Sequence, residues 1–262
     1  MNRAMHTAAT GMVAQQMFVD TIAHNLSNVN TTAYKKSTVD FQDLFYQTLS
    51  ARSAASADGR VRTAQVEVGH GTRVAGTEKI FQQGSLTSTS NDLDLALAGD
   101  GFFHLLRPDG TSAYTRDGSF RISEDGRLVT ADGLPLEPEV SIPEDTATIQ
   151  ISQDGVVSVL VTGEEELDDI GHIELAKFLN PAGLKALGGN LFEPTSASGQ
   201  PLLSTAGLDG LGTIQQGYLE ASNVDVVEEM INMIMAQRAY EISSKAIRTS
   251  EDMLAIVNNL RR

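Results

Sequence analysis

The sequence predicts an α+β fold in which long N- and C-terminal helices pair in a coiled-coil-like bundle and flank a central antiparallel β-rich domain. Apolar residues recur at helical spacing near both ends, and short strand patterns alternate with turn signals between them. We expect a terminal helical assembly domain, an extended connecting β and loop region, and an outer β-rich domain. Their predicted bounds are 1–32 with 222–262, 33–93 with 206–221, and 94–205.

The N-terminal segment carries apolar residues that fall on one face of a helix. This predicted stripe consists of Met5, Ala8, Met12, Val19, Ile22, Leu26 and Val29. The Asn and Thr residues within 28–32 favour the end of the helix, because Asn tolerates the left-handed conformation and Thr is a poor helix former.

The C-terminal segment carries a second apolar stripe. It consists of Val224, Val227, Ile231, Met235, Ala239, Ile242, Ala246, Met253, Ile256 and Leu260. We expect Ser222 or Asn223 to cap this helix, and Ala239 and Ala246 to permit close helix packing. Such terminal helices have only each other, or neighbouring copies of the chain, to pack against. The sequence therefore predicts an assembly protein.

The middle of the chain reads as strands and turns. Small and polar residues at 50–60 predict a loop or flexible arm, and we expect the arm to extend over about 46–65. Leu93, Leu95 and Leu97 alternate with Asp or Ala, which predicts a half-buried strand. Asp-Gly pairs at 100–101, 109–110, 117–118, 125–126, 132–133 and 154–155 predict hairpin turns in an antiparallel meander.

Composition excludes several classes of partner. The net charge of −15 argues against nucleic acid and anionic membrane surfaces. The absence of Cys excludes disulfides and thiolate chemistry, and the 5% aromatic content predicts no large aromatic cluster. No segment reaches the roughly 18 consecutive apolar residues of a membrane span, so we expect no direct membrane insertion. The first ten residues contain a single Arg and no apolar core, so we expect no cleaved secretory signal.

No catalytic residue, metal ligand or cofactor-binding residue is assigned. The five His residues lack metal-ligand spacing, and Gly69-His70-Gly71 lacks the strand and helix of a phosphate-binding loop. From Glu137 to Glu174 there are eleven acidic residues and no Lys or Arg, which favours a solvated face. A surface kept anionic to repel or slide past a neighbour is the alternative.

Both ends resemble a known family. The run from Asn25 to Lys36 closely resembles the N-terminal motif of the axial proteins of the bacterial flagellum, the rod and hook family. The run from Gly217 to Ile231, continued at 237–241, is similar to the family's C-terminal motif. The motif positions are Asn25, Asn28, Asn30, Tyr34, Lys35, Ser222, Asn223, Gln237, Arg238, Tyr240 and Glu241. Stretches at 43–48, 83–86, 113–120 and 180–184 look most like the subfamily that builds the distal rod.

The resemblance implies that many copies stack helically into a straight, hollow drive shaft that transmits torque from the motor to the hook across the periplasm. It implies contacts with the chain itself, proximal rod proteins, the hook protein, the P and L rings, and the flagellar type III export apparatus. Export by that apparatus would need no cleaved signal. Asn25 and Asn28 are candidates for bonds between subunits or for helix-terminating caps. A hook or proximal rod protein, or remotely a secreted β-domain enzyme, remains an alternative.

Overall fold

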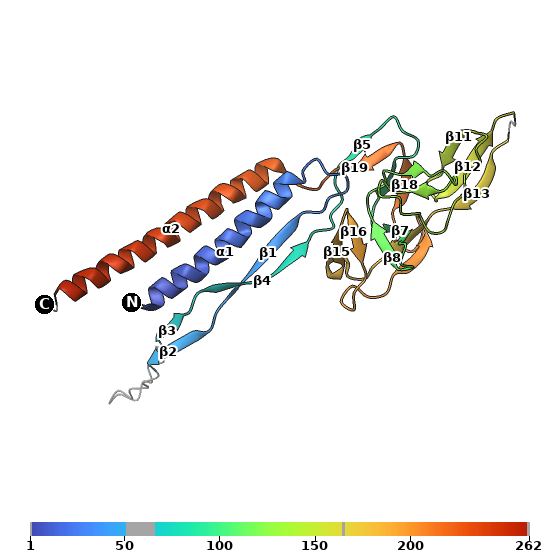
Figure 1. Cartoon of the computed structure of the whole chain (residues 1–262). Helices are drawn as coiled ribbons and strands as arrows, with labels where there is room; N and C mark the ends of the chain where they lie inside the picture. Colours follow the sequence, from blue (N-terminus) through green and yellow to red (C-terminus); the bar gives the residue numbers. More distant parts are fainter. Residues whose placement is uncertain (1, 51–65, 164–165, 261–262) are drawn as a thin grey trace, which may run out of the picture. The chain divides into compact units, whose positions relative to one another are not determined.

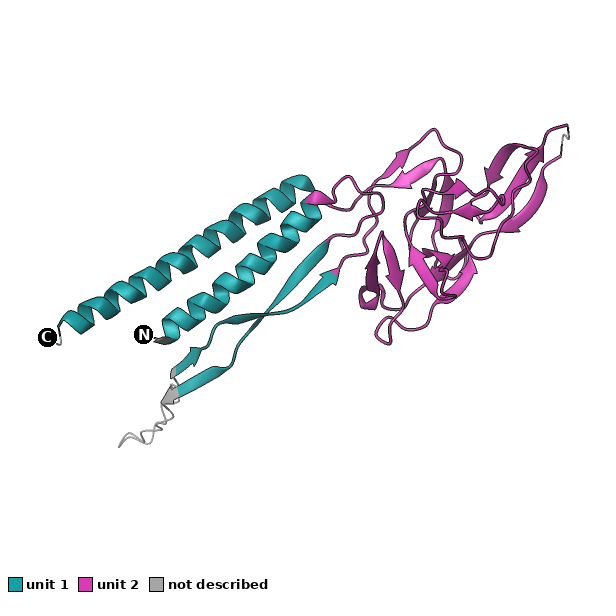
Figure 2. Cartoon of the chain, viewed as in Figure 1, with its two compact units in different colours: residues 1–26, 37–78, 225–262 teal, residues 27–36, 79–224 magenta. Residues whose placement is uncertain are grey.

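A computed structural model describes residues 2–50, 66–163 and 166–260. The chain divides into two compact units, each built from segments that are distant in sequence (Figure 2). Unit 1 contains Met1–Leu26, Ser37–Glu78 and Asp225–Arg262, and unit 2 contains Ser27–Lys36 and Lys79–Val224. The backbone passes from one unit to the other after residues 26, 36, 78 and 224, so each unit depends on both halves of the sequence.

Unit 1 is organised around the two terminal helices, α1 (Asn2–Ser27) and α2 (Val226–Asn259), which lie side by side (Figure 1). Asn25 lies opposite Glu229 and Gly11 lies opposite Ser243, so the helices run antiparallel. The predicted pairing of long terminal helices is confirmed. The helix stop is also close to its predicted place, because α1 ends at Ser27 and is followed by turns.

A two-stranded ribbon completes unit 1. β1 (Ser37–Asp43) pairs with β4 (Thr72–Lys79), and β2 (Tyr46–Ser50) pairs antiparallel with β3 (Val66–Gly69). The ribbon contacts α1 through Phe18 and Phe41, whose rings meet edge to face at 5.8 Å between centroids. The predicted arm at 46–65 begins as β2, whereas residues 51–65, including most of the predicted loop, lie outside the described residues.

Unit 2 is antiparallel and β-rich, as predicted. Its largest sheet has six strands in the order β15-β16-β8-β7-β14-β17. Their bounds are β7 (Phe102–Leu106), β8 (Ser112–Thr115), β14 (Glu174–Lys177), β15 (Lys185–Gly188), β16 (Leu191–Glu193) and β17 (Leu202–Thr205). A short 3₁₀ helix, η1 (Pro181–Gly183), precedes β15.

The other sheets of unit 2 are smaller. The three-stranded sheet contains β11 (Thr146–Ile151), β12 (Val156–Val161) and β13 (Asp168–His172). Three strand pairs are β6 (Leu95–Ala98) with β18 (Thr213–Gln216), β5 (Leu86–Ser88) with β19 (Tyr218–Glu220), and β9 (Arg121–Ile122) with β10 (Leu128–Val129). The pairing of β5 with β19 ties the end of the β region back to its beginning.

The prediction of hairpin turns at the Asp-Gly pairs was only partly confirmed. The pairs at 109–110, 125–126 and 154–155 join neighbouring paired strands, and the pair at 132–133 makes a turn closed by the bridge between Val129 and Pro135. The pairs at 100–101 and 117–118 do not join paired strands, so the hairpin prediction is wrong there. Gly118 serves close packing instead, because a Cβ on it would lie 1.6 Å from the carbonyl oxygen of Leu95.

Two further predictions were wrong, one about the burial of a strand and one about aromatic packing. Leu95, Ala96 and Leu97 are all buried, because both faces of β6 are covered, so this strand is not half-buried. Despite the low aromatic content, unit 2 contains an aromatic cluster of edge-to-face rings. It consists of Phe81, Phe102, Tyr114, Phe178 and Phe192. A larger aliphatic core, with Phe103 packed against Phe120, fills the rest of the unit.

Two observations concern the surface of the described chain. No described helix combines the length and apolar character that crossing a membrane requires. Most described acidic residues of the 137–174 segment are exposed on unit 2, as a solvated face requires. Glu164 and Glu165 in that segment lie outside the described residues.

Candidate assembly site

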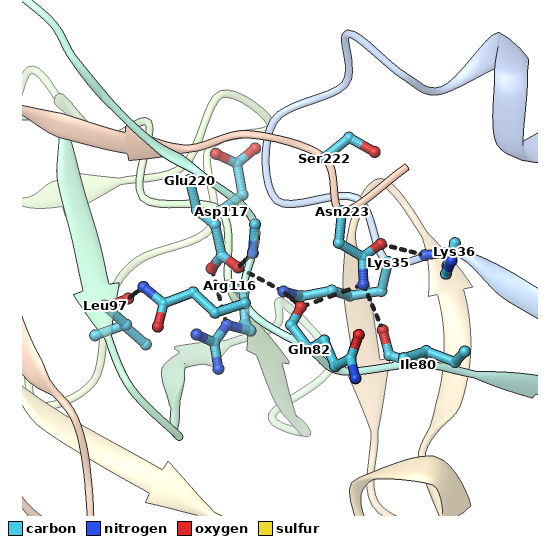
Figure 3. A network of polar contacts seen from close by, with 12 residues as sticks. Lys35, Lys36, Ile80, Gln82, Leu97, Arg116, Asp117, Glu220, Ser222 and Asn223 are labelled. Atoms are coloured by element: carbon cyan, nitrogen blue, oxygen red, sulfur yellow. Dashed lines mark hydrogen bonds and ion pairs between the residues drawn. The ribbon is translucent and has the colours of Figure 1, made fainter. Parts of the chain in front are cut away.

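Three charged residues from distant parts of the sequence meet inside unit 2. Glu220 accepts hydrogen bonds from Lys35 Nζ at 2.5 Å and from Arg116 Nε at 3.0 Å (Figure 3). The side chains of Lys35 and Glu220 are fully buried, and that of Arg116 is 2% exposed. We call Lys35, Arg116 and Glu220 the clasp. It joins the N-terminal motif, an internal motif stretch and the C-terminal motif.

Backbone geometry brings the clasp together. Lys35 lies two residues after Ala33, whose φ of 55° turns the chain. The Ala33 N–H donates to the Glu220 carbonyl at 2.8 Å. Arg116 directly follows β8, and Glu220 ends β19. The Gly84 N–H donates to Glu220 Oε1 at 2.8 Å, and a Cβ on Gly84 would lie 2.0 Å from a backbone oxygen. A glycine at this position therefore permits the close approach of the Ala221 carbonyl oxygen.

Two cations share one carboxylate in the clasp, and backbone carbonyls accept the other hydrogen bonds that these cations donate. Arg116 donates to Gly99 O at 2.7 Å and to Gly101 O at 3.1 Å, and Lys35 donates to Gln82 O at 2.7 Å. Burial, together with the charge of Arg116, lowers the pKa of Lys35 to about 8, although Glu220 opposes the shift. Lys35 is therefore mainly protonated at neutral pH.

Asn223 forms a second link between the two motifs. Its Oδ1 accepts a hydrogen bond from the Lys36 N–H at 2.7 Å, and its Nδ2 donates to Ile80 O at 2.8 Å (Figure 3). Beside it, the half-buried Ser222 accepts a hydrogen bond from the Val224 N–H through Oγ at 3.3 Å. The buried Tyr34 lies beneath Lys79 Nζ, 5.0 Å from the ring centroid. These motif residues shape the backbone of unit 2.

The motif asparagines differ in environment. Asn25 is buried in unit 1, where its amide group donates to Ser37 O and accepts from the Ser37 N–H, both at 2.9 Å. Its Nδ2 also reaches Glu229 of α2 at 3.5 Å. Asn28 Oδ1 accepts from Thr31 Oγ1 at 3.1 Å in the turn after α1, and Asn30 is exposed. Asn25 and Asn28 thus form hydrogen bonds within the chain, near the end of α1.

The N-cap prediction for the C-terminal helix was wrong. Neither Ser222 nor Asn223 caps α2, which begins only at Val226. Asp225 is the N-cap, and its Oδ1 accepts from the N–H groups of Val227 at 2.8 Å and Glu228 at 3.2 Å. An extended backbone conformation at Asp225 allows this geometry, whereas Ser222 and Asn223 are occupied in unit 2.

The face of α2 that contacts α1 is small and polar. Glu229, Ala236, Ser243 and Ser250 follow one another at spacings of seven residues, and three of them are buried. Opposite Ser243, α1 contributes Gly11, and Ala14 and Ile22 of α1 are buried. The remaining predicted N-terminal stripe is half-buried, and consists of Met5, Ala8, Met12, Val19, Leu26 and Val29. The two helices meet through small side chains at Gly11 and Ser243, where a Cβ on Gly11 would lie 3.7 Å from Ser243 Oγ.

The predicted apolar stripe of α2 lies on a different face from this contact. Its large members are exposed by fractions between 48% for Met253 and 82% for Leu260. We call them the exposed ridge: Val227, Ile231, Met235, Ile242, Met253, Ile256 and Leu260. Of the other predicted members, Val224 is buried before the helix, Ala239 is half-buried and Ala246 is exposed. Ala246 therefore does not make the predicted close contact.

The remaining motif residues also lie on the exposed surface of α2. They are Gln237, Arg238, Tyr240 and Glu241. The described residues contain no group of three His, Cys, Asp or Glu side chains able to hold a metal ion. The arrangement thus combines a closed polar clasp in one unit with an unusually apolar helix surface in the other, which suits assembly better than chemistry.

Comparisons with known proteins agree with this interpretation. Three family models match: "Flagella basal body rod protein" at 5–35, "Flagellar hook protein FlgE/F/G D1 domain" at 96–159, and "Flagellar basal body rod FlgEFG protein C-terminal" at 215–260. The chain is 51% identical to the flagellar basal-body rod protein FlgG of Borreliella burgdorferi, with all of both chains covered. It is 44% identical to FlgG of Caulobacter vibrioides over 99% of both chains, and 38% identical to FlgG of Bacillus subtilis over all of both.

Proposed function

The chain belongs to the FlgG family of flagellar basal-body rod proteins, as a structural subunit of the distal rod, and from this premise we propose that its copies polymerise helically through the exposed ridge. The product is a straight, hollow drive shaft that carries torque from the motor to the hook across the periplasm. The family is structural and has no enzymatic role, which removes the alternative of a secreted enzyme.

The exposed ridge is the observation that supports polymerisation most directly. Seven large apolar side chains of one helix are each about half exposed or more in the single chain. Burying one such side chain contributes roughly 1.5–3 kcal/mol, so covering several at once gives a substantial driving force. Contiguous apolar surfaces of this kind mark interaction sites on soluble proteins.

The clasp supports a mechanical role for unit 2. A drive shaft requires subunits that keep their shape under load, and buried ion pairs and dense packing resist deformation. Lys35, Arg116 and Glu220 connect segments from three parts of the chain, so they oppose separation of these segments. Under the proposal, the terminal helical domain (1–32 with 222–262) assembles, the region 33–93 with 206–221 connects, and the domain 94–205 lies on the outside.

The proposed neighbours follow from a place in the distal rod. Copies of the chain contact each other, proximal rod proteins lie at one end, the hook protein lies at the other, and the P and L rings surround the shaft. The type III export apparatus delivers the subunits. The family membership supports the rod position, and the acidic surface of unit 2 is compatible with a shaft that turns without sticking to anionic surfaces.

Electron microscopy of the concentrated full-length protein tests the proposal. We expect straight tubes from the wild type and none from Ile231→Asp, because a charge would have to be buried in the contact. Arg248→Asp is the control on the exposed surface of α2, outside both the ridge and the family motif, and it should still form tubes. Tubes from Ile231→Asp would contradict the role of the ridge, and curved tubes from the wild type would indicate a hook-like subunit.

A further inference from the structure

Unit 1 contains an apolar groove between α1 and β4. Its volume is about 410 Å³, and its lining includes Ala9, Val13, Ala14 and Met17 of α1 and Val74 of β4. Val13 is 61% exposed and Met17 is 44% exposed, whereas Ala14 is buried. Small residues thus form the base of the groove, and larger apolar side chains remain open to a ligand at its sides.

We propose that this α1–β4 groove receives the N-terminal half of the exposed ridge from a second copy of the chain. The inference rests on the proposed polymerisation and names the surface that the ridge meets. The relevant part of the ridge is Val227, Ile231 and Met235, which are all more than half exposed. Branched and flexible apolar side chains of this kind are well suited to fill a shallow groove whose base consists of small residues.

The geometry of growth favours the groove over a second ridge as the contact. If the ridge of one copy met the ridge of another, the contact would be symmetric and would close after two subunits. A ridge that meets a groove is asymmetric, so each copy keeps one free ridge and one free groove, and addition continues. A rod subunit requires this open-ended arrangement.

Charge complementarity supports the same pairing. Among the described residues that line the groove, none is acidic, and His6 of α1 and the exposed Arg73 of β4 both contribute to the lining. The first turns of α2 carry Asp225 and Glu228, and no Lys or Arg occurs in the sequence from there until Arg238. An acidic helix start therefore meets a basic groove lining, which favours one direction of docking.

Cysteine cross-linking tests the contact directly, because the chain has no Cys of its own. Val13→Cys is combined in turn with Val227→Cys, Ile231→Cys or Met235→Cys in the full chain, and tubes are oxidised and run on a denaturing gel. We expect at least one pair to give a ladder of covalent oligomers, because every subunit donates one thiol at the groove and another at the ridge. Val13→Cys combined with Arg248→Cys, an exposed position of α2 outside the ridge and the family motif, is the control and should give no ladder.

The outcomes distinguish failure of the groove contact from failure of the proposed polymerisation. Tubes that give no ladder with any of the three pairs would overturn the groove contact while leaving polymerisation intact. Covalent dimers from Ile231→Cys alone would also overturn it, since they indicate a symmetric ridge contact. Absence of wild-type tubes would count against the proposed function itself. Cross-links within one chain are not expected, because the ridge lies on a different face of α2 from the residues that meet α1, Glu229 and Ser243.

A charge reversal provides an independent test. Arg73→Glu should raise the critical concentration for assembly by about tenfold or more, because it places an acidic group against the acidic start of α2. Arg121→Glu makes the same change at an exposed position of unit 2 and should leave assembly unaffected. Equal critical concentrations for the two variants would contradict the proposed docking direction. Circular dichroism should show both variants folded.

Discussion

Replacing Glu220 by Gln should destabilise the protein more than any surface charge change. In the wild type, Glu220 Oε1 accepts from Lys35 Nζ and from the Gly84 N–H, and Oε2 accepts from Arg116 Nε. The substitution turns one of these oxygens into an NH₂ group that faces a donor. It also leaves the buried charges of Lys35 and Arg116 without their counter-charge.

The expected magnitude follows from that loss. Breaking a buried ion pair by removing one partner costs about 3–5 kcal/mol, because the remaining charge stays desolvated. A domain is stable by about 5–15 kcal/mol in total, so the variant should unfold at clearly lower urea concentration. Lys35→Met should cost less than Glu220→Gln, because it removes one of two cations and leaves Arg116 paired with Glu220.

Urea unfolding followed by circular dichroism measures these differences. Glu193→Gln is the matched control, because Glu193 pairs with Lys185 at 3.1 Å on the exposed surface of the same unit. Exposed pairs contribute about 0.2–1 kcal/mol. The reasoning would be refuted if Glu220→Gln were no more destabilising than Glu193→Gln, or if Lys35→Met proved the worse of the two clasp variants.

Three further predictions follow from single contacts. The pKa of Lys35 is about 8 in the folded chain and 10.5 in the reference state, so the unfolded chain binds more protons between these values. The free energy of unfolding of the wild type, relative to that of Lys35→Met, should therefore rise with pH across this window. A fall would contradict the assignment. Asp225→Ala should cost about 0.5–2 kcal/mol and speed amide exchange at the start of α2, and unchanged exchange would exclude a capping role. Gly118→Ala should destabilise strongly, because its Cβ would overlap the Leu95 carbonyl, whereas Gly76→Ala, with open space around it, should be nearly neutral in thermal unfolding; similar midpoints would contradict the packing.

The sequence predicted the helices better than their contacts. Large apolar residues marked the exposed ridge of α2, but the contact with α1 uses Ala236, Ser243 and Ser250, which produce little hydrophobic periodicity. Small residues are compatible with many environments, so their role depends on the partner helix. The same reason explains Ala96, whose position in an alternating pattern indicated exposure although both faces of its strand are covered.

The clasp was predictable only in part. Lys35 belongs to a recognisable motif, but its partner Glu220 is 185 positions away, and Arg116 is 104 positions from Glu220. Local patterns carry no information about pairs at such separations, because only the folded backbone brings them together. Neither charge nor periodicity distinguished Glu220 from the many exposed acidic residues. The signal that a single sequence does offer is the presence of Arg116 and Glu220 inside the internal and C-terminal motif stretches.

The position of Glu220 has a consequence for how a subunit matures. A chain that is delivered from its N-terminus presents Lys35 first and Arg116 later, while their shared carboxylate is still to arrive. We expect a chain ending at residue 216, which lacks β19, to remain open to proteolysis, and protease resistance of that fragment would contradict this expectation. The burial of both cations is therefore complete only in a nearly full-length subunit, so we expect shortened copies to lack a stable unit 2.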